Sequence, residues 1–279
     1  MKFILALLSI GSIFCISSKP ANALTTILYD GSGAPEFDSP PWLAPGAINS
    51  SGGIAALSGT SVTGGFQIDS NASGEEYSGY SNYNPFTSGF VNSSFPTLDN
   101  NSGYSIFFNV ALDTTNDFSD TSDDRAAFSI TAIGSGNQGI EIGFDEDRIF
   151  AQENNFTRAE TQNFGSISIS TDYQLTVLGN NYELLADTGS GFSSVINGSL
   201  RTYNFDPLAS DPPLGTFNPY EIPGFLFFGD NTGQAHGTFT LGEISISTTS
   251  VPFEFSPNFG LALLGLSLGV KKLFTLRSK

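Results

Sequence analysis

Short segments in which apolar and polar residues alternate fill the middle of this chain, and they predict β-strands. Residues 127–133 alternate in this way, and residues 104–110 form a strong run of β-favouring types. Two further runs flank Gly179-Asn180-Asn181, a good hairpin turn. We therefore expect strands near residues 25–30, 62–68, 104–110, 127–133, 139–144, 148–151, 173–178, 182–185, 200–203, 225–228 and 239–247.

Many short strands separated by turn residues are typical of packed antiparallel sheets rather than of βαβ units. Residues 31–59 and 70–103 are rich in Gly, Ser, Asn and Pro, and they are expected to form long loops. A segment of this length suits a single β-sandwich or barrel. The pattern therefore predicts an all-β fold, a two-sheet antiparallel β-sandwich over residues 24–250.

Residues 1–23 have the features of a secretory signal peptide. Lys2 supplies the positive start, and Phe3 to Ser17 is an apolar run broken only by small residues. Ala21 and Ala23 match the small-x-small pattern that a signal peptidase needs. We expect cleavage after Ala23; the alternative is an uncleaved N-terminal anchor.

Residues 251–279 form a tail with three parts. A Pro-flanked motif covers residues 251–257, an apolar run covers 259–270, and a basic end covers 271–279. An apolar segment followed by Lys and Arg is a stop-transfer pattern that keeps the positive end in the cytoplasm. We expect one short C-terminal transmembrane helix over about residues 255–274; the alternative is a soluble core helix.

This order of parts resembles the PEP-CTERM class of bacterial sorting signals. Pro252, Phe253 and Glu254 look like the Pro-Phe-Glu variant seen in cyanobacteria, although Phe253 separates the proline from the glutamate. The resemblance implies an exosortase-like membrane protease as a partner. It also implies an exported protein that is anchored in the cell envelope through its tail or released to the extracellular matrix.

The charge balance limits the partners of the middle of the chain. Residues 24–250 contain four arginines, no lysine and 26 of the 27 acidic residues, a formal charge of −22. Binding to nucleic acid requires clustered Lys and Arg, so nucleic acid is excluded as a partner. Divalent cations or neutral sugars suit this surface better. Cys15 is the only cysteine and leaves with the signal peptide, so no disulfide is expected.

The order of strands and turns resembles the laminin-G/concanavalin-like jelly roll over about residues 100–248. The resemblance is carried by the acidic-turn hairpin at 139–151, the hairpin at 173–184, Phe227-Phe228-Gly229-Asp230-Asn231 and the closing run at 241–246. Similar domains include carbohydrate binders, adhesion modules and enzymes, and the fold alone does not choose among them.

Two groups of residues are candidates for ligand binding. Oxygen-rich side chains suit Ca²⁺, and the candidate metal ligands are Asp113, Asp117, Asp120, Asp123, Asp124 and Asp230. The alternative is a solvated acidic loop. Aromatic rings in a polar loop can stack on sugar rings, and the candidates for glycan stacking are Tyr77, Tyr80 and Tyr83. The alternative is an ordinary surface loop pinned by aromatic residues.

Catalytic motifs are weak in this chain. His236 is the only histidine, and no nucleophile elbow accompanies it. Glu141 and Asp145 lie on one strand face, but the middle carboxylate of a glucanase E-x-D-x-E series is missing. The sequence thus predicts a non-enzymatic module that is carbohydrate-binding, adhesive or structural, with a glycoside-active jelly-roll enzyme or a purely structural matrix protein as alternatives.

Truncation after Ser250 tests the tail. Because nothing in residues 251–279 continues the period-two pattern, the truncated protein should stay folded and soluble but no longer be retained at the membrane. Replacing Pro252, Phe253 and Glu254 by alanine should leave the protein membrane-bound and unprocessed. Cell fractionation and mass spectrometry measure both. A truncated protein that aggregates would mean that residues 259–270 belong to the core.

Calcium is tested by thermal unfolding. The formal charge of −22 and the lack of a disulfide predict self-repulsion that bound cations relieve. Millimolar Ca²⁺ should raise the melting temperature, since a ligand that binds only the native state stabilises it. A shift no larger than that produced by NaCl of equal ionic strength would exclude a specific site.

Overall fold

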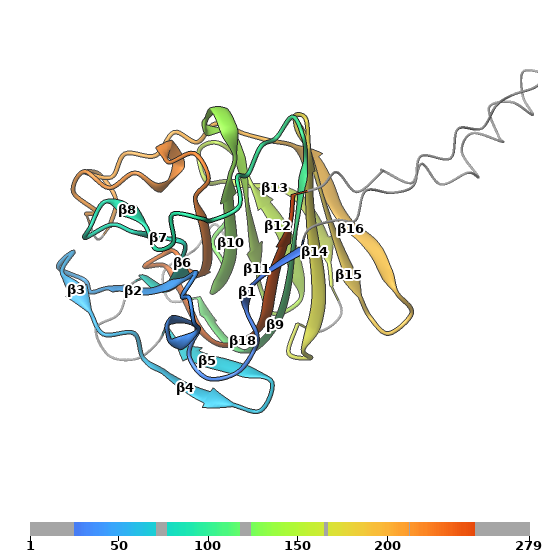
Figure 1. The fold of residues 1–279 in the computed structure, drawn as a ribbon, viewed down its shortest axis with the longest axis horizontal. Helices are drawn as coiled ribbons and strands as arrows, with labels where there is room; N and C mark the ends of the chain where they lie inside the picture. Colours follow the sequence, from blue (N-terminus) through green and yellow to red (C-terminus); the bar gives the residue numbers. More distant parts are fainter. Residues whose placement is uncertain (1–24, 71–76, 118–123, 165–166, 212, 249–279) are drawn as a thin grey trace, which may run out of the picture.

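Two antiparallel β-sheets pack face to face in the computed structural model, which describes residues 25–70, 77–117, 124–164, 167–211 and 213–248 (Figure 1). The predicted all-β sandwich is confirmed, and among the described residues helix is confined to three short 3₁₀ turns at Pro35–Phe37, Ser135–Asn137 and Pro219–Glu221. No helix among the described residues is long and apolar enough to cross a membrane. The expected signal peptide and sorting tail, with Ala21, Ala23, Pro252, Phe253 and Glu254, lie outside the described residues.

The first sheet, called sheet A, is built around two long central strands. In order across the sheet its strands are β16 (Phe192–Ser199), β15 (Asn181–Asp187), β14 (Thr171–Leu178), β9 (Tyr104–Asp117), β18 (Ala235–Ser247), β5 (Gly65–Asp69) and β4 (Gly59–Val62), and β1 (Thr25–Tyr29) also pairs with β18.

The second sheet, called sheet B, carries the site described below. Its order is β13 (Arg158–Asn163), β12 (Arg148–Gln152), β11 (Gly139–Phe144), β10 (Phe128–Ile133), β17 (Leu226–Asp230), β6 (Tyr77–Ser81), β2 (Ala44–Ile48) and β3 (Ile54–Ala55). A separate small hairpin joins β7 (Tyr83–Asn84) to β8 (Gly89–Phe90).

Aromatic rings from the two inner faces fill the core between the sheets. Phe108 of sheet A lies edge-on to Phe144 of sheet B, with ring centroids 6.0 Å apart. The ring centroids of Phe239 in sheet A and Phe128 in sheet B lie 5.0 Å apart. All four side chains are buried, and fully burying one such side chain contributes about 1.5–3 kcal/mol to stability.

The structure corrects three of the expected elements. Residues 62–68 are not one strand, because Gly64 has a positive φ of 88° and turns β4 back into β5. Residues 200–203 make only an isolated bridge, between Arg201 and Gly139. The expected loops 31–59 and 70–103 contain strands β2, β3, β6, β7 and β8, and the pattern missed the pairing of β2 with β6 because the outer positions of β6 are tyrosine, glycine and serine.

Both ends of the described chain lie side by side in sheet A. Thr25 at the start of β1 pairs with Ser247 at the end of β18. The loop 231–234 precedes Ala235 at the other end of β18, which has 13 residues. At about 3.3 Å a residue, the two ends of this strand lie about 40 Å apart.

Candidate functional site

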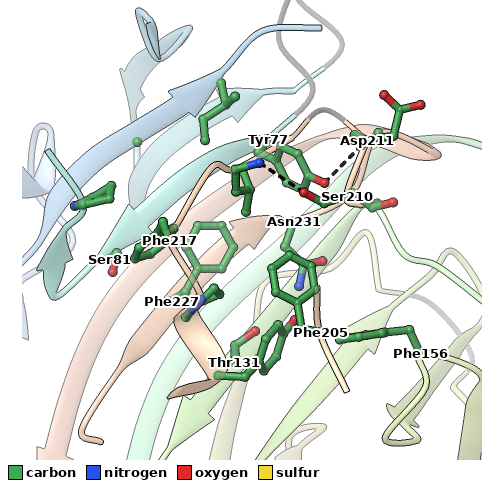
Figure 2. A pocket seen from close by; sticks show the side chains of 18 of the residues that line it. Tyr77, Ser81, Thr131, Phe156, Phe205, Ser210, Asp211, Phe217, Phe227 and Asn231 are labelled. Carbon is green, nitrogen blue, oxygen red and sulfur yellow. Dashed lines mark hydrogen bonds between the residues drawn. The ribbon is translucent and has the colours of Figure 1, made fainter. Parts of the chain in front are cut away.

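A cleft of about 900 Å³ opens on the outer face of sheet B (Figure 2). Its floor comes from outward-facing positions of β2, β6, β17 and β10, which are neighbours in the sheet. Its walls come from residues 155–157, the segment 205–220, the β7–β8 hairpin and the loop 231–234. These segments are far apart in the sequence, so the cleft exists only in the folded chain.

Phe227 of β17 belongs to the floor, and the tip of its ring lies over two glycines of the sheet. Phe227 is flanked in the sheet by Ser81 of β6 and Thr131 of β10. A Cβ placed on Gly79 or Gly229 would lie 2.8 or 2.9 Å from Cζ of Phe227. Only glycine at these two positions therefore lets the ring approach the backbone, and the ring lines the cleft.

Aromatic side chains that also form a second hydrophobic cluster make the walls. Tyr83 and Phe217 stack with centroids 6.0 Å apart and planes inclined by 17°. Phe205 lies edge-on to Phe156 at 5.9 Å on the other side of the cleft. The buried members of this cluster are Ile133, Tyr203, Tyr220 and Phe225. The segment 203–225 thus covers part of the outer face of sheet B with its own small core.

A buried carboxylate fastens this segment to the sheet. Glu141 on β11 is 1% exposed, and the hydroxyl of Tyr220 donates a hydrogen bond to its Oε2. The backbone N–H of Glu141 donates to the hydroxyl of Tyr203 at 2.7 Å. Burial, and next the charge of Glu141, raises the pKa of both tyrosines well above the usual range. Both hydroxyls therefore stay protonated and hold the segment in place.

Arg125 connects this buried carboxylate to the cleft. Its Nη1 lies 3.7 Å from Oε1 of Glu141, and its Nη2 donates to the backbone oxygen and to Oδ1 of Asn231, both at 3.3 Å. The guanidinium also lies over the ring of Phe156, 5.3 Å from the centroid. Arg125 and Asn231 both line the cleft, so they offer polar groups beside the aromatic walls.

Two of the three tyrosines proposed for stacking line the cleft, and the third does not. Tyr77 and Tyr83 are half-buried at its edge, and the hydroxyl of Tyr77 donates to the backbone oxygen of Asp211 at 3.1 Å. Tyr80 instead points into the core, is 0% exposed, and donates to Oε2 of Glu36 at 2.7 Å. Side chains alternate between the two faces of a sheet along a strand. Tyr80 comes three positions after Tyr77 on β6, so the two point to opposite faces.

The aspartates proposed as metal ligands are separated where the structure describes them. Asp113 is exposed on sheet A and accepts hydrogen bonds from Gln67 and Thr240. Asp124 lies at the cleft and accepts a hydrogen bond from the backbone N–H of Arg158 on sheet B.

Four candidate metal ligands remain, namely Asp117, Asp120, Asp123 and Asp230. Asp230 is buried beside His236. Asp120 and Asp123 lie outside the described residues, as does the side chain of Asp117. Among the described residues, no three His, Cys, Asp or Glu side chains form a group that could hold a metal ion.

The carboxylate pair weighed for a glycosidase does not face the cleft together. Glu141 is held beneath Tyr220, as described above. Asp145 is 2% exposed at the turn after β11, where Nε of Arg148 donates to its Oδ2 at 3.0 Å. Each carboxylate has its own arginine partner, so this pair is structural.

His236, Asp230 and Ser70 form a buried cluster next to the loop 231–234. Nδ1 of His236 lies 3.0 Å from Oδ2 of Asp230, and Oδ1 of Asp230 accepts from the backbone N–H of Thr232. Ser70 is 1% exposed and bonds both backbone groups of Gly237. A serine enclosed in this way cannot reach an ester in solvent, so the cluster braces the loop rather than forming an accessible nucleophilic triad.

The sequence reasoning missed the four phenylalanines that dominate the cleft, Phe156, Phe205, Phe217 and Phe227. One signal was present. Residues 225–228 are apolar at four consecutive positions, which indicates a strand that is covered on both faces. The covering segment could have been sought between 203 and 225, where Phe205 and Phe217 stand close to prolines in an otherwise polar stretch.

Comparisons with known proteins bear on the fold. No family model and no curated protein matches this sequence. Among solved structures, a carbohydrate esterase from the Shiga toxin-encoding bacteriophage phi24B aligns with a TM-score of 0.49 and 10% identity, over 81% of this chain and 100% of that chain. The exoplasmic/lumenal domain of VIP36, bound to Ca²⁺ and Man3GlcNAc, aligns with a TM-score of 0.46 and 11% identity, over 83% of this chain and 92% of that chain.

The alginate lyase A1-II′ of polysaccharide lyase family 7 aligns with a TM-score of 0.42 and 10% identity, over 75% of this chain and 95% of that chain. A Trypanosoma rangeli sialidase aligns over 81% of this chain but only 30% of its own length, with a TM-score of 0.43 and 12% identity. These structural neighbours are jelly-roll or concanavalin-like β-sandwich proteins. The resemblance concerns the fold, and no site residue is carried over from it.

The comparisons contradict the prediction that this chain is not an enzyme. The similar structures include a carbohydrate esterase, sialidases and alginate lyases. The prediction rested on the lack of a linear motif. Catalytic groups on a sandwich come from strands and loops that are distant in sequence, so a missing linear motif does not exclude catalysis.

Asp230 predicts a pH dependence of stability. Burial raises its pKa to about 7, although the bonds from His236, Ser70 and Thr232 act in the opposite direction. The native state therefore keeps this proton between about pH 4 and 7, where the unfolded chain has lost it, so stability should fall as pH rises through this window. The slope from this one group is at most about 1.4 kcal/mol per pH unit.

Urea unfolding of the wild type and of Asp230→Asn at pH 5 and pH 7 measures this effect. The variant should be less pH-dependent, whatever its overall stability. Asp113→Asn, at an exposed carboxylate, is the matched control and should keep the wild-type slope. Equal slopes for the wild type and Asp230→Asn would show that Asp230 does not titrate in this window.

Proposed function

We propose that this protein binds a neutral glycan in the cleft on the outer face of sheet B. The observation that carries the proposal is the ring of Phe227, whose tip lies close over Gly79 and Gly229 and which lines the floor of the cleft. A pyranose ring has an apolar C–H face and a rim of hydroxyls. It therefore suits a flat aromatic surface that is surrounded by hydrogen-bonding groups.

The polar groups around the floor support this ligand class. Ser81 and Thr131 flank Phe227 in the sheet, and Asn231 stands beside Arg125. Ser81, Asn231 and Arg125 line the cleft, are less buried than Thr131, and can exchange hydrogen bonds with hydroxyl groups. Sugar hydroxyls both donate and accept, so they match such a mixed set of groups.

Charge favours a neutral glycan over an acidic one. Asp124 and Asp211 line the cleft, and Arg125 is held against the buried Glu141. The whole chain has a formal charge of −17, so a polyanion would be repelled at long range. The proposal concerns recognition, and chemistry on the bound glycan would be a further property of the same cleft.

The localisation remains a proposal from the sequence. We propose that the protein is exported and held at the cell envelope through residues 251–279, or released from there after processing by an exosortase-like protease. Ser247 lies about 40 Å along β18 from the loop 231–234 at the cleft. A tether after Ser247 would thus hold this end of the cleft away from the membrane. Calcium stays a proposal for the segment 113–124.

Phe227→Ala tests the binding site. A glycan array of neutral polysaccharides should identify a ligand for the wild type, and calorimetry should then show affinity about tenfold or more lower for the variant, because the aromatic floor is lost. Phe192→Ala removes a 44%-exposed ring from sheet A and should bind like the wild type. Melting curves must show that both variants are folded. Unchanged affinity in a folded Phe227→Ala would place the glycan site elsewhere.

A further inference from the structure

We propose that the cleft holds an internal stretch of a long polysaccharide chain, and that Phe86, at the tip of the β7–β8 hairpin, forms an outer subsite for this chain. The inference rests on the proposed function and names its substrate class as a polymer rather than a free mono- or disaccharide. It is carried by the extent of the cleft, by the fixed position of an exposed ring, and by the aromatic path between the floor and that ring.

The floor is wide enough for several sugar units. It spans β2, β6, β17 and β10, and strands in a sheet lie about 4.8 Å apart, so the floor alone extends about 14 Å. Residues 155–157 and the hairpin tip add to this length at the two sides. The volume of about 900 Å³ lies at the upper end of the range for small-molecule pockets. A single sugar ring would fill only a part of it.

The hairpin holds Phe86 in a defined position. Oδ1 of Asn84 accepts hydrogen bonds from the backbone N–H groups of Phe86 at 2.9 Å and Thr87 at 3.3 Å, which closes the turn. At the base of the hairpin, Tyr83 lies edge-on to Phe90, with ring centroids 5.5 Å apart. Tyr83 also stacks on Phe217, with centroids 6.0 Å apart. The hairpin is therefore anchored to the wall of the cleft, and the side chain of Asn84 orders its tip.

Phe86 is exposed and yet belongs to the cleft. Its side chain is 52% exposed, and it is one of the residues that line the cavity. A ring that packed only to stabilise the hairpin would be covered, as Tyr83 is in part by Phe90 and Phe217. A half-exposed ring at the mouth of an aromatic cleft offers a face to a ligand that extends out of it.

The aromatic surfaces form a path from the floor to this mouth. Phe227, Phe217 and Tyr83 each pack against the second hydrophobic cluster, and Tyr83 stacks on Phe217. Phe86 follows Tyr83 by three residues at the tip of the same hairpin. A chain that stacks one unit on Phe227 can thus continue over the wall and contact Phe86 with a later unit. We therefore expect a disaccharide that stacks on Phe227 to stay on the floor, and Phe86 to contact only a longer chain.

The length dependence of binding tests the inference. The probes are cello-, manno-, xylo- and chito-oligosaccharides of two to six units, titrated by calorimetry into the wild type, Phe86→Ala and the control Phe192→Ala. For the series that binds, wild-type affinity should rise with each unit beyond two. Phe86→Ala should bind the disaccharide like the wild type but the pentamer and hexamer about three- to tenfold more weakly. Phe192→Ala should follow the wild type throughout.

The outcomes separate this inference from the proposed function. Affinity that does not increase beyond the disaccharide, or a Phe86→Ala variant that is equally weakened at every length, overturns the polymer subsite and leaves glycan binding intact. Binding of no oligosaccharide by the wild type overturns both. Light scattering measures the oligomeric state of the wild type and of Phe86→Ala. If the wild type is a dimer and the variant is a monomer, Phe86 serves self-association and the subsite is overturned.

Discussion

The buried carboxylate of Glu141 is the contact on which the rest of the site depends. A carboxylate that is 1% exposed must be compensated, because an unpaired buried charge is strongly destabilising. Tyr220 and Arg125 compensate it, and Tyr203 accepts from its backbone N–H. These partners come from the segment before β10 and from the segment that follows Arg201. One buried group thereby fixes where two distant parts of the chain lie on sheet B.

The wall of the cleft follows from this arrangement. Once Tyr203 and Tyr220 are held over β11, the residues between and after them must cross the outer face of sheet B, where Phe217 stacks on Tyr83 and Phe225 joins the second cluster. Strands β10 and β11 are consequently buried at every position, on both faces. The part of the outer face that this cover leaves open is the cleft, with Phe227 as its floor.

The four arginines of residues 24–250 show how an acidic chain uses few cations. Arg148 pairs with Asp145 at a turn, and Arg201 bonds both Glu153 and Glu160 beside the bridge to Gly139. Arg158 lies over the ring of Phe150, while Arg125 reaches Glu141. Each therefore has a structural contact on sheet B or at its edge. Since the carboxylates of Glu141 and Asp145 are buried, salt should weaken their contacts with Arg125 and Arg148 less than it weakens exposed pairs.

Local pattern determined the fold class and several of the strands. The alternating run at 127–133 became β10, the runs around Gly179-Asn180-Asn181 became β14 and β15, and the acidic turn at 145–147 joined β11 to β12. Such features depend on neighbours in the sequence, because side-chain alternation and turn chemistry are local properties. The same reasoning left out β2 and β6, whose outer positions mix small residues with Ile48 and Tyr77 and so show no clear alternation.

The candidate site was decided by the tertiary structure. The tyrosines 77, 80 and 83 looked equivalent in the sequence, but strand pairing sends Tyr80 into the core and leaves Tyr77 and Tyr83 at the cleft. The sequence likewise could not show that Gly79 and Gly229 meet beneath Phe227, since that meeting depends on the register of β6 and β17. The sequence by itself determined the sandwich and the acidity of its surface. Which aromatic rings face the cleft was determined by contacts between residues far apart in the sequence, such as Gly79 and Gly229 or Tyr83 and Phe217, which only folding brings together.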